Sequence, residues 1–281
     1  MSSAKELIVK VISSSDANRI VRALHYSGKV VNNSQIHLGV FLRDKCGGAM
    51  QFGPSLDKRK MLGLVRGTLW NEFLELNRMA FADWLPRNGE SRCIGYAMRF
   101  IRAHYPWIKW VVSFADATQC GDGTIYRASG FVLTAIKKND QIWEAPTGET
   151  FNDTSIRPGI GSAKTFRRAA EVVSRTTATK GRHILNNGAS SMAQFKEAGW
   201  NPKAGFQLRY LYFLKAECRN DLTVPILPFS EIERLGAGMY RGKKVERVGS
   251  KEDVAAGCQP AEGGSIPTPT LQPQATASGE E

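Results

Sequence analysis

Cysteine is scarce in this chain, and its spacing suggests no structural use. The 281 residues include five cysteines, at positions 46, 93, 120, 218 and 258, and no two of them form a CxxC pair. Disulfide frameworks and zinc knuckles both need cysteines in characteristic, closely spaced patterns. We therefore exclude both kinds of site, and we expect Cys93 and Cys120 to be reduced, unreactive thiols.

Long apolar runs are also missing. No stretch of about 18 uncharged apolar residues occurs, so no membrane span and no membrane partner are expected. The N-terminal segment MSSAKELIVKVISSSD lacks the apolar centre and the small-residue cleavage site of a secretory signal. We therefore expect a cytoplasmic protein.

Acidic residues are outnumbered by basic ones, which gives a net charge of +12. From Ser250 onward the chain holds one lysine and five acidic residues, so the preceding 249 residues carry about +16. A folded body this basic predicts a polyanionic partner, most often nucleic acid. A basic surface without a specific partner is the alternative.

The order of apolar patterns predicts an α/β fold with a mixed sheet. We expect helices over 16–26, 91–104 and 124–129, and strands within 36–42, 48–53, 70–81, 108–116, 131–137 and 205–215. Residues 140–204 are polar, rich in glycine and basic, with two short helix candidates at 163–175 and 190–199, so we interpret them as an insertion. Residues 249–281 lack large apolar groups and are expected to form a disordered tail.

One segment of the insertion is the best candidate for DNA contact. Residues 157–182 contain a single acid, Glu171, and serines and threonines lie between the basic residues, as suits phosphate binding. The basic residues are Arg157, Lys164, Arg167, Arg168, Arg175, Lys180 and Arg182. A solvated basic face is the alternative.

The stretch GESRCIGYAMRFI, residues 89–101, opens a predicted helix with an unusual pattern. Gly95 lies inside that helix, although glycine in a helix interior costs about 1 kcal/mol relative to alanine. A backbone that must approach a large anion would explain it, because amides and dipole at a helix N-terminus bind phosphates. We expect Ser91 to cap the helix and Arg92 to add positive charge beside the anion. The small side chain of Ala97 is expected to leave room on the same face. The alternative is an amphipathic helix whose glycine packs against a strand.

A strand, a loop, an Arg-x-x-Gly-x-Ala helix start and a second strand together resemble the acetyl-CoA-binding core of the GNAT acyltransferases. The resemblance implies a GNAT-like mixed sheet flanked by helices over residues 1–248, with 140–204 as the insertion. It also implies that acetyl-CoA places its diphosphate at the first turns of the helix. The residues expected to bind the cofactor are Arg78, Ser91, Arg92, Gly95 and Ala97.

Longer strings resemble the Mom-type phage DNA-modification proteins. These strings are LHYSGKVVNNSQIHLGVF (24–41), LELNRM (74–79), NGESRCIGYAMRFI (88–101), VSFADATQCGDGTIYRASGF (112–131) and GMYRGKK (238–244). The family converts adenine in phage DNA to N6-carbamoylmethyladenine, which blocks host restriction enzymes. The resemblance implies an acyltransferase-like enzyme in the host cytoplasm, with double-stranded DNA and acyl-CoA as partners.

The resemblance also implies roles for single residues. It places His25 and Tyr26 in the active site, and Arg78, Ser91 and Tyr126 at positions important for cofactor binding or activity. Asp116, at the end of its strand, lies where a catalytic acid or base is expected. His25, Tyr26 and Asp116 together offer donor atoms for a metal ion such as iron, and the sequence leaves open whether one binds. Many family members have a histidine near position 120, whereas this chain has Cys-Gly-Asp over 120–122.

The chemistry of adenine gives Asp116 and Tyr126 plausible tasks. The exocyclic amine is a poor nucleophile because it is conjugated with the ring, so a carboxylate at a strand's C-terminal end could take its proton. Tyr126 could protonate a leaving thiolate. For Asp116 the alternative is a cap on the following loop, and for Tyr126 a half-buried aromatic. A histidine at the end of a helix, like His25, is also stabilised there by the helix dipole alone.

Adenine N6 lies inside a duplex, so we expect the base to be flipped out. Two other functions remain open from the sequence. One is an ordinary GNAT N-acetyltransferase acting on a protein or small amine, and the other is a basic DNA-binding protein without catalysis.

Overall fold

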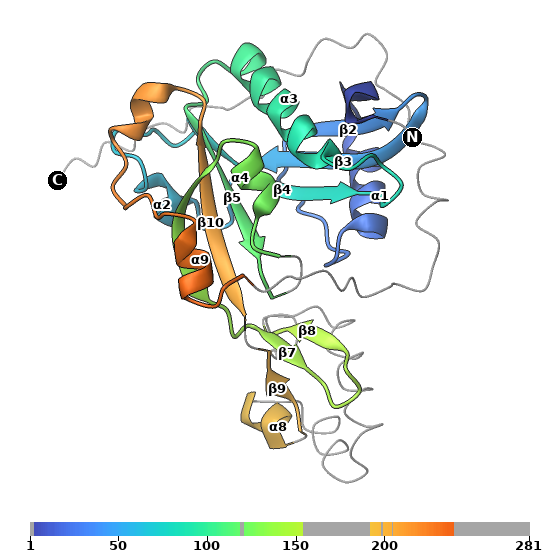
Figure 1. The fold of residues 1–281 in the computed structure, drawn as a ribbon, viewed down its shortest axis with the longest axis vertical. Coiled ribbons are helices and arrows are strands. Elements are labelled where there is room, and N and C mark those ends of the chain that lie inside the picture. The colour runs from blue at the N-terminus through green and yellow to red at the C-terminus, as the bar shows by residue number, and fades with distance from the viewer. Residues whose placement is uncertain (1–2, 119–120, 154–191, 198, 204, 239–281) are drawn as a thin grey trace, which may run out of the picture.

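The computed structural model describes residues 3–118, 121–153, 192–197, 199–203 and 205–238 (Figure 1). Several predicted features lie outside the described residues. They are Cys120, the helix candidate at 163–175, the tail at 249–281 and the proposed DNA-binding residues Arg157, Lys164, Arg167, Arg168, Arg175, Lys180 and Arg182.

A seven-stranded mixed sheet forms the body of the molecule, which confirms the predicted α/β class. Its strands follow the spatial order β1-β2-β3-β4-β5-β10-β6, and every neighbouring pair is antiparallel except β4 with β5. The strands are β1 (Leu7–Val11), β2 (Ile36–Leu42), β3 (Lys45–Gly53), β4 (Phe73–Phe81), β5 (Trp110–Asp116), β6 (Val132–Lys138) and β10 (Phe206–Phe213). Strand β1 was not predicted.

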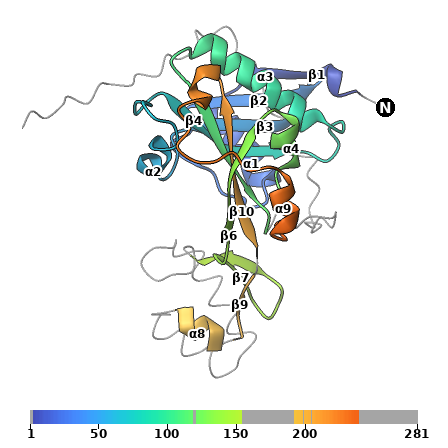
Figure 2. The same ribbon diagram turned by 60° about the vertical axis from the view of Figure 1, so that its left-hand side comes forward.

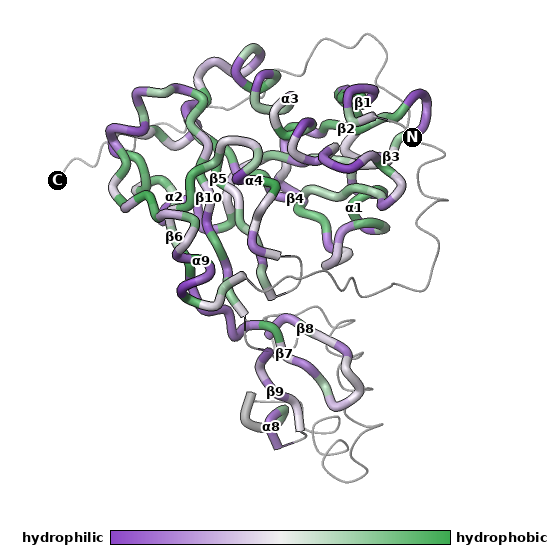
Figure 3. Tube along the Cα trace, viewed as in Figure 1, coloured by the Kyte–Doolittle hydropathy of each residue, from purple (hydrophilic) through white to green (hydrophobic). Residues whose placement is uncertain are grey.

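Helices cover both faces of this sheet. They are α1 (Ser14–Leu24), α2 (Lys58–Leu62), α3 (Gly89–His104), α4 (Thr124–Ala128) and α9 (Ser230–Arg234), with short 3-10 turns at Ala4–Glu6 and Ala216–Arg219. Helices α3, α4 and α9 share one apolar cluster with the strands, and α1 and α2 pack on the opposite face in two smaller clusters (Figure 2). Hydrophobic colour follows the central strands in Figure 3. We call these two faces the α3 face and the α1 face.

Strands β4 and β5 begin as a parallel pair and then separate. Their register is Phe73↔Trp110, Leu74↔Val111 and Glu75↔Val112, and no pairing continues beyond it although both strands do. Figure 1 shows the two strands running in different directions. A bulge at Asn77 shifts β4 against β3, since Phe52 pairs with Leu76 and Gln51 with Arg78. The sheet therefore opens at the carboxyl ends of both strands.

A second, three-stranded sheet lies within the residues predicted to be an insertion. It has the order β8-β7-β9 and consists of β7 (Ile142–Glu144), β8 (Thr150–Asn152) and β9 (Asn201–Pro202). The buried Phe151, Phe195 and Trp200 pack beside it, with Phe195 contributed by α8 (Met192–Glu197). Figures 1 and 2 both place this sheet away from the main one.

Within the described residues, no helix combines the length and the apolar character needed to cross a membrane.

Candidate functional site

The N-terminus of α3 is built differently from the prediction. Its N-cap is Asn88, which has a φ of 65° and makes no side-chain capping bond, so the expectation that Ser91 caps the helix is wrong. Ser91 lies in the first turn, and its Oγ donates to the carbonyl oxygen of Asn88 at 3.2 Å. The carbonyl oxygen of Ser91 accepts from Ser129 Oγ at 3.4 Å, which joins α3 to the end of α4. The helix thus starts without the side-chain acceptor that usually satisfies its first amides.

Gly95 faces open space rather than a strand. A Cβ added there would meet only Arg99 Nη1, at 3.8 Å, so packing does not require a glycine. The alternative of a glycine packed against the sheet is therefore wrong. Arg92, three residues earlier, is exposed. Ala97 is fully buried in the core beneath α3, so its expected position on the open face is wrong.

His25 and Tyr26 follow directly after α1. The buried His25 is the C-cap, and its Nδ1 accepts from the backbone N–H of Ser27 at 3.1 Å and lies 2.8 Å from Ser27 Oγ. Because Nδ1 is an acceptor, a neutral ring carries its proton on Nε2. Tyr26 is 38% exposed, and its ring centroid lies 4.2 Å from that of His25. The turn therefore presents one buried and one exposed ring.

Arg78 connects that turn to β4. Its Nε donates to the carbonyl oxygen of Lys29 at 2.9 Å, and its Nη1 donates to that of Asn77 at 2.6 Å. Burial lowers the pKa of Arg78, while its interactions with Tyr26 and Glu75 act in the opposite direction. The guanidinium is thus oriented by two backbone oxygens at the bulge of β4 and placed near Tyr26.

Glu75 lies on β4 near Arg78 of the candidate site, and the sequence analysis did not single it out. Burial raises the pKa of the Glu75 carboxyl. The hydrogen bonds from the Ser55 side chain and the Leu56 N–H and the charge of Arg78 act in the opposite direction. The lysine that holds Arg78, Lys29, has its pKa lowered by burial and by that same arginine. An acid between two leucines in a strand is the signal that could have identified Glu75.

Asp116 ends β5 on the α1 face. Trp110 and Val112 belong to the cluster beneath α2, and strand alternation places Asp116 on their side. Its Oδ1 accepts from the backbone N–H of Thr118 at 3.0 Å and from Asn139 Nδ2 at 3.4 Å. Asp116 therefore makes the contacts expected of a residue that caps the following loop. These contacts hold its carboxylate at the end of the strand.

Tyr126 lies on the other face. It is buried on α4, with ring centroids 5.4 Å from Phe131 and 5.3 Å from Tyr210, so it packs as an aromatic core residue. The register partner of Tyr210 is Ser113 in β5, whose buried Oγ has no hydrogen-bond partner among the described residues. The α3 face thus contains an unsatisfied hydroxyl beside these rings.

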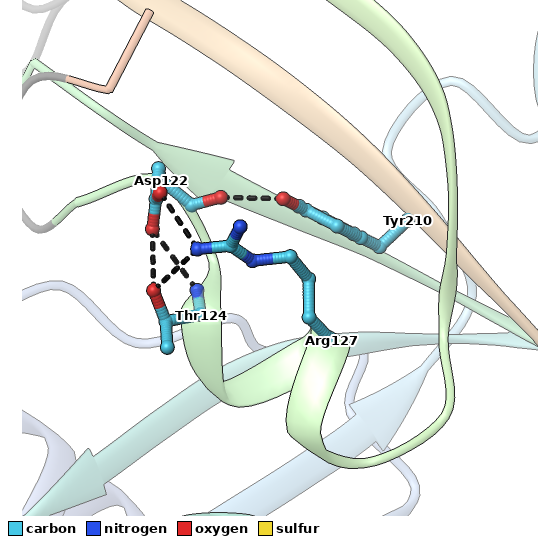
Figure 4. Close-up of polar contacts among 4 residues, drawn as sticks. All are labelled: Asp122, Thr124, Arg127 and Tyr210. Atoms are coloured by element: carbon cyan, nitrogen blue, oxygen red, sulfur yellow. Dashed lines mark hydrogen bonds and ion pairs between the residues drawn. The ribbon is translucent and has the colours of Figure 1, made fainter. Parts of the chain in front are cut away.

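The loop before α4 is fixed by a polar network (Figure 4). Asp122 accepts from Thr124 N–H at 3.1 Å and from Arg127 Nη2 at 2.9 Å, and its carbonyl oxygen accepts from Tyr210 Oη at 2.5 Å. A Cβ on Gly123 would lie 2.5 Å from the Tyr210 ring, so only glycine fits there. Asp122 therefore has a structural partner in Arg127.

The structure sorts the predicted residues by face. Arg78 and Asp116 lie on the α1 face on either side of the opening between β4 and β5, because Arg78 pairs with Gln51, which contacts Asn18 of α1. The α3 N-terminus and Tyr126 belong to the opposite face. Among the described residues, no three His, Cys, Asp or Glu side chains cluster as a metal site would require.

Comparison with known proteins decides the family. The model of the Mom protein family matches residues 6–231. The chain belongs to the Mom protein family. It is 45% identical over 129 residues to the methylcarbamoylase Mom of Escherichia phage Mu, a match that covers 46% of this chain and 53% of that protein. This Mom-family chain thus spans about half the length of the curated relative it matches.

Solved structures of low similarity include several acetyltransferases, of which two serve as examples. One is the Bacillus subtilis acetyltransferase in complex with CoA, at 8% identity and a TM-score of 0.38, covering 74% of this chain and 98% of that one. The other is a GNAT-family acetyltransferase from Streptococcus pneumoniae, at 15% identity and a TM-score of 0.33, covering 47% and 89%. The fold of this Mom-family chain is defined by its strand order and its diverging parallel pair.

Proposed function

We propose that this chain modifies the N6 amine of adenine in phage DNA to give N6-carbamoylmethyladenine, with an acyl-CoA as cofactor. One observation supports this proposal most directly. The open N-terminus of α3 and the catalytic candidate Asp116 lie on opposite faces of a sheet that separates between β4 and β5. A cofactor on one face and a base on the other can therefore meet at the gap. We propose that this modification protects the DNA from restriction in the host cytoplasm.

The α3 face fits the diphosphate of acetyl-CoA. The first-turn amides and the dipole of α3 favour an anion, and the open surface at Gly95 lets a phosphate approach the backbone. Exposed Arg92 and the first-turn Ser91 lie on the same helix and would bind phosphate oxygens. When bound, the cofactor supplies an activated acyl thioester. Tyr126 is the proposed donor of a proton to the cofactor's thiolate sulfur as that sulfur leaves the acyl group.

The α1 face fits the acceptor. Asp116, held by Thr118 and Asn139, is placed to take the proton from N6 as the amine attacks. Tyr26 offers an exposed ring, and His25 would present the protonated Nε2 of its neutral form. Arg78, expected from the sequence to bind the cofactor, lies on this face instead, and we assign it to holding this turn against β4. The basic residues of 157–182 remain the proposed DNA contacts.

The product sets a limit on the chemistry. A carbamoylmethyl group joins N6 to a CH2 carbon, whereas acyl transfer from acetyl-CoA alone would give N6-acetyladenine. A nitrogen source and a rearrangement or oxidation are needed in addition. We therefore assign to these residues only binding, orientation and proton transfer at N6.

Mass spectrometry of nucleosides tests the proposal. DNA co-expressed with the full chain is digested to nucleosides, and deoxyadenosine is examined for the mass of a carbamoylmethyl group in place of one hydrogen. Its appearance with wild type, and its absence with Asp116→Asn, is the expected result. An acetyl increment, or acetylated protein or amine with unmodified DNA, would instead indicate an ordinary acetyltransferase. DNA binding without any modified nucleoside would indicate a binding protein without catalysis.

A further inference from the structure

The segment between β3 and β4 exposes large apolar side chains. Leu56 is 98% exposed, Leu69 67% and Trp70 48%. A single exposed leucine is common on protein surfaces, but three large apolar groups in fifteen residues form a feature that needs a partner. We call residues 54–72 the β3–β4 segment.

The start of the β3–β4 segment lies beside the candidate site, whereas its end contacts Lys109 and Trp110 at the start of β5. The backbone N–H of Leu56 and the side chain of Ser55 both bind the carboxylate of Glu75. Glu75 is the last residue of β4 that pairs with β5 before the strands separate. Leu56 therefore projects into solvent from the point where the sheet opens, on the face that holds Arg78 and Asp116.

The charge of the segment suits a polyanion. Lys58 Nζ lies 4.6 Å from the ring centroid of Trp70 and donates to Asn71 Oδ1 at 3.3 Å, so the two side chains hold each other in place. Arg59 and Arg66 are exposed, and neither makes an ion pair within the described part of the chain. Lys58, Arg59 and Arg66 thus lie between Leu56 and Leu69 in the sequence, where their charges can bind DNA phosphates.

We propose that Leu56 enters the DNA base stack as a wedge and fills the space left by the displaced adenine. This inference rests on the proposed function, since it takes DNA as the partner. Flipping a base breaks its stacking and pairing, and proteins that deform DNA offset this by inserting an apolar side chain between bases. Lys58 and Arg59 then bind phosphates beside the wedge, and Trp70 contacts the neighbouring nucleotide.

The test separates base displacement from modification. A set of DNA duplexes carries 2-aminopurine in varied sequence contexts. The fluorescence of 2-aminopurine rises when this base leaves the stack. Wild type is expected to raise the fluorescence, and Leu56→Ala to reduce the displaced fraction about tenfold. Leu56→Met, which keeps a long apolar side chain, should restore most of the signal. Leu235→Ala, at a leucine 41% exposed at the end of α9, should match wild type.

Modification rates give the second measurement. The loss in Leu56→Ala should be about tenfold on a duplex and should disappear when the base opposite the target adenine is absent, because that adenine is already unpaired. Equal displacement by Leu56→Ala and wild type would overturn the inference. The inference would also be overturned if Leu56→Ala changed only the self-association of the protein, measured by sedimentation. That result would assign the exposed surface to contacts between copies of this chain. A wild type that displaces the base but modifies nothing would leave the wedge standing and refute the proposed chemistry.

Discussion

Arg78 Nε donates to the carbonyl oxygen of Lys29 at 2.9 Å, across forty-nine residues of sequence. With the bond from Nη1 to Asn77, this contact fixes the turn that carries His25 and Tyr26 against the bulge of β4. One planar guanidinium thus orders the turn on the proposed acceptor side. Because a lysine ammonium lacks that fork geometry, the site depends on arginine at this position.

Arg78→Lys tests this dependence. We expect the free energy of unfolding to fall by about 1–3 kcal/mol, because one of the two charged hydrogen bonds is lost in a half-buried setting. Nucleoside modification should fall with it. Urea denaturation and nucleoside analysis measure the two effects. Arg219→Lys, at an exposed position of the 3-10 turn Ala216–Arg219, is the control and should be neutral. A stable, fully active Arg78→Lys would contradict the assignment.

Asp116 and Asp122 allow function and structure to be separated. Asp116→Asn keeps the Oδ1 that accepts from Thr118, so we expect stability to change by less than about 1 kcal/mol while modification is lost. DNA affinity, measured by salt-dependent binding, should be retained. Asp122→Asn removes the ion pair to Arg127 and should lower stability by about 1–2 kcal/mol. Full modification activity in Asp116→Asn would refute its role as a base.

Substitutions of Gly95 should affect the stability of the fold and the binding of the cofactor differently. Gly95→Ala places its Cβ only near Arg99 Nη1, so the unfolding free energy should rise by about 1 kcal/mol from helix propensity. Gly95→Leu should weaken binding of CoA in calorimetry, because the larger side chain would occupy the phosphate surface.

The control for Gly95 is another glycine of α3. A Cβ on Gly89 would lie 2.7 Å from Leu7 Cδ1, so Gly89→Ala should destabilise the fold. Undiminished CoA affinity in Gly95→Leu would exclude this face of α3 as the phosphate site.

Glu75 predicts a pH dependence of stability. Burial raises its folded-state pKa above the ordinary value of 4.5, so the native state holds its proton longer than the unfolded state. Stability should therefore decline as pH rises from about 4.5 through the raised pKa, and the penalty should be absent at lower pH. Glu75→Gln should lack this decline. Parallel urea titrations between acidic and neutral pH measure the difference, and identical pH profiles would show that Glu75 contributes none of it.

The sequence by itself determined the α/β class, most strands, the helix from 91 to 104 and the family, because apolar periodicity and local motifs are properties of neighbouring residues. It missed β1, whose strand character depends on pairing Leu7 with Leu42. It also placed Ser91 and Ala97 by pattern, whereas the start of α3 and its buried face set their positions.

Only the tertiary structure decided which residues share a site. Glu75 and Leu56 meet because β4 passes beside the β3–β4 segment, and no local pattern contains that contact. Strand pairing and alternation place Arg78 and Asp116 on one face, and α3 packs on the other. Strand register and face depend on long-range pairing, so a chain read residue by residue cannot contain them.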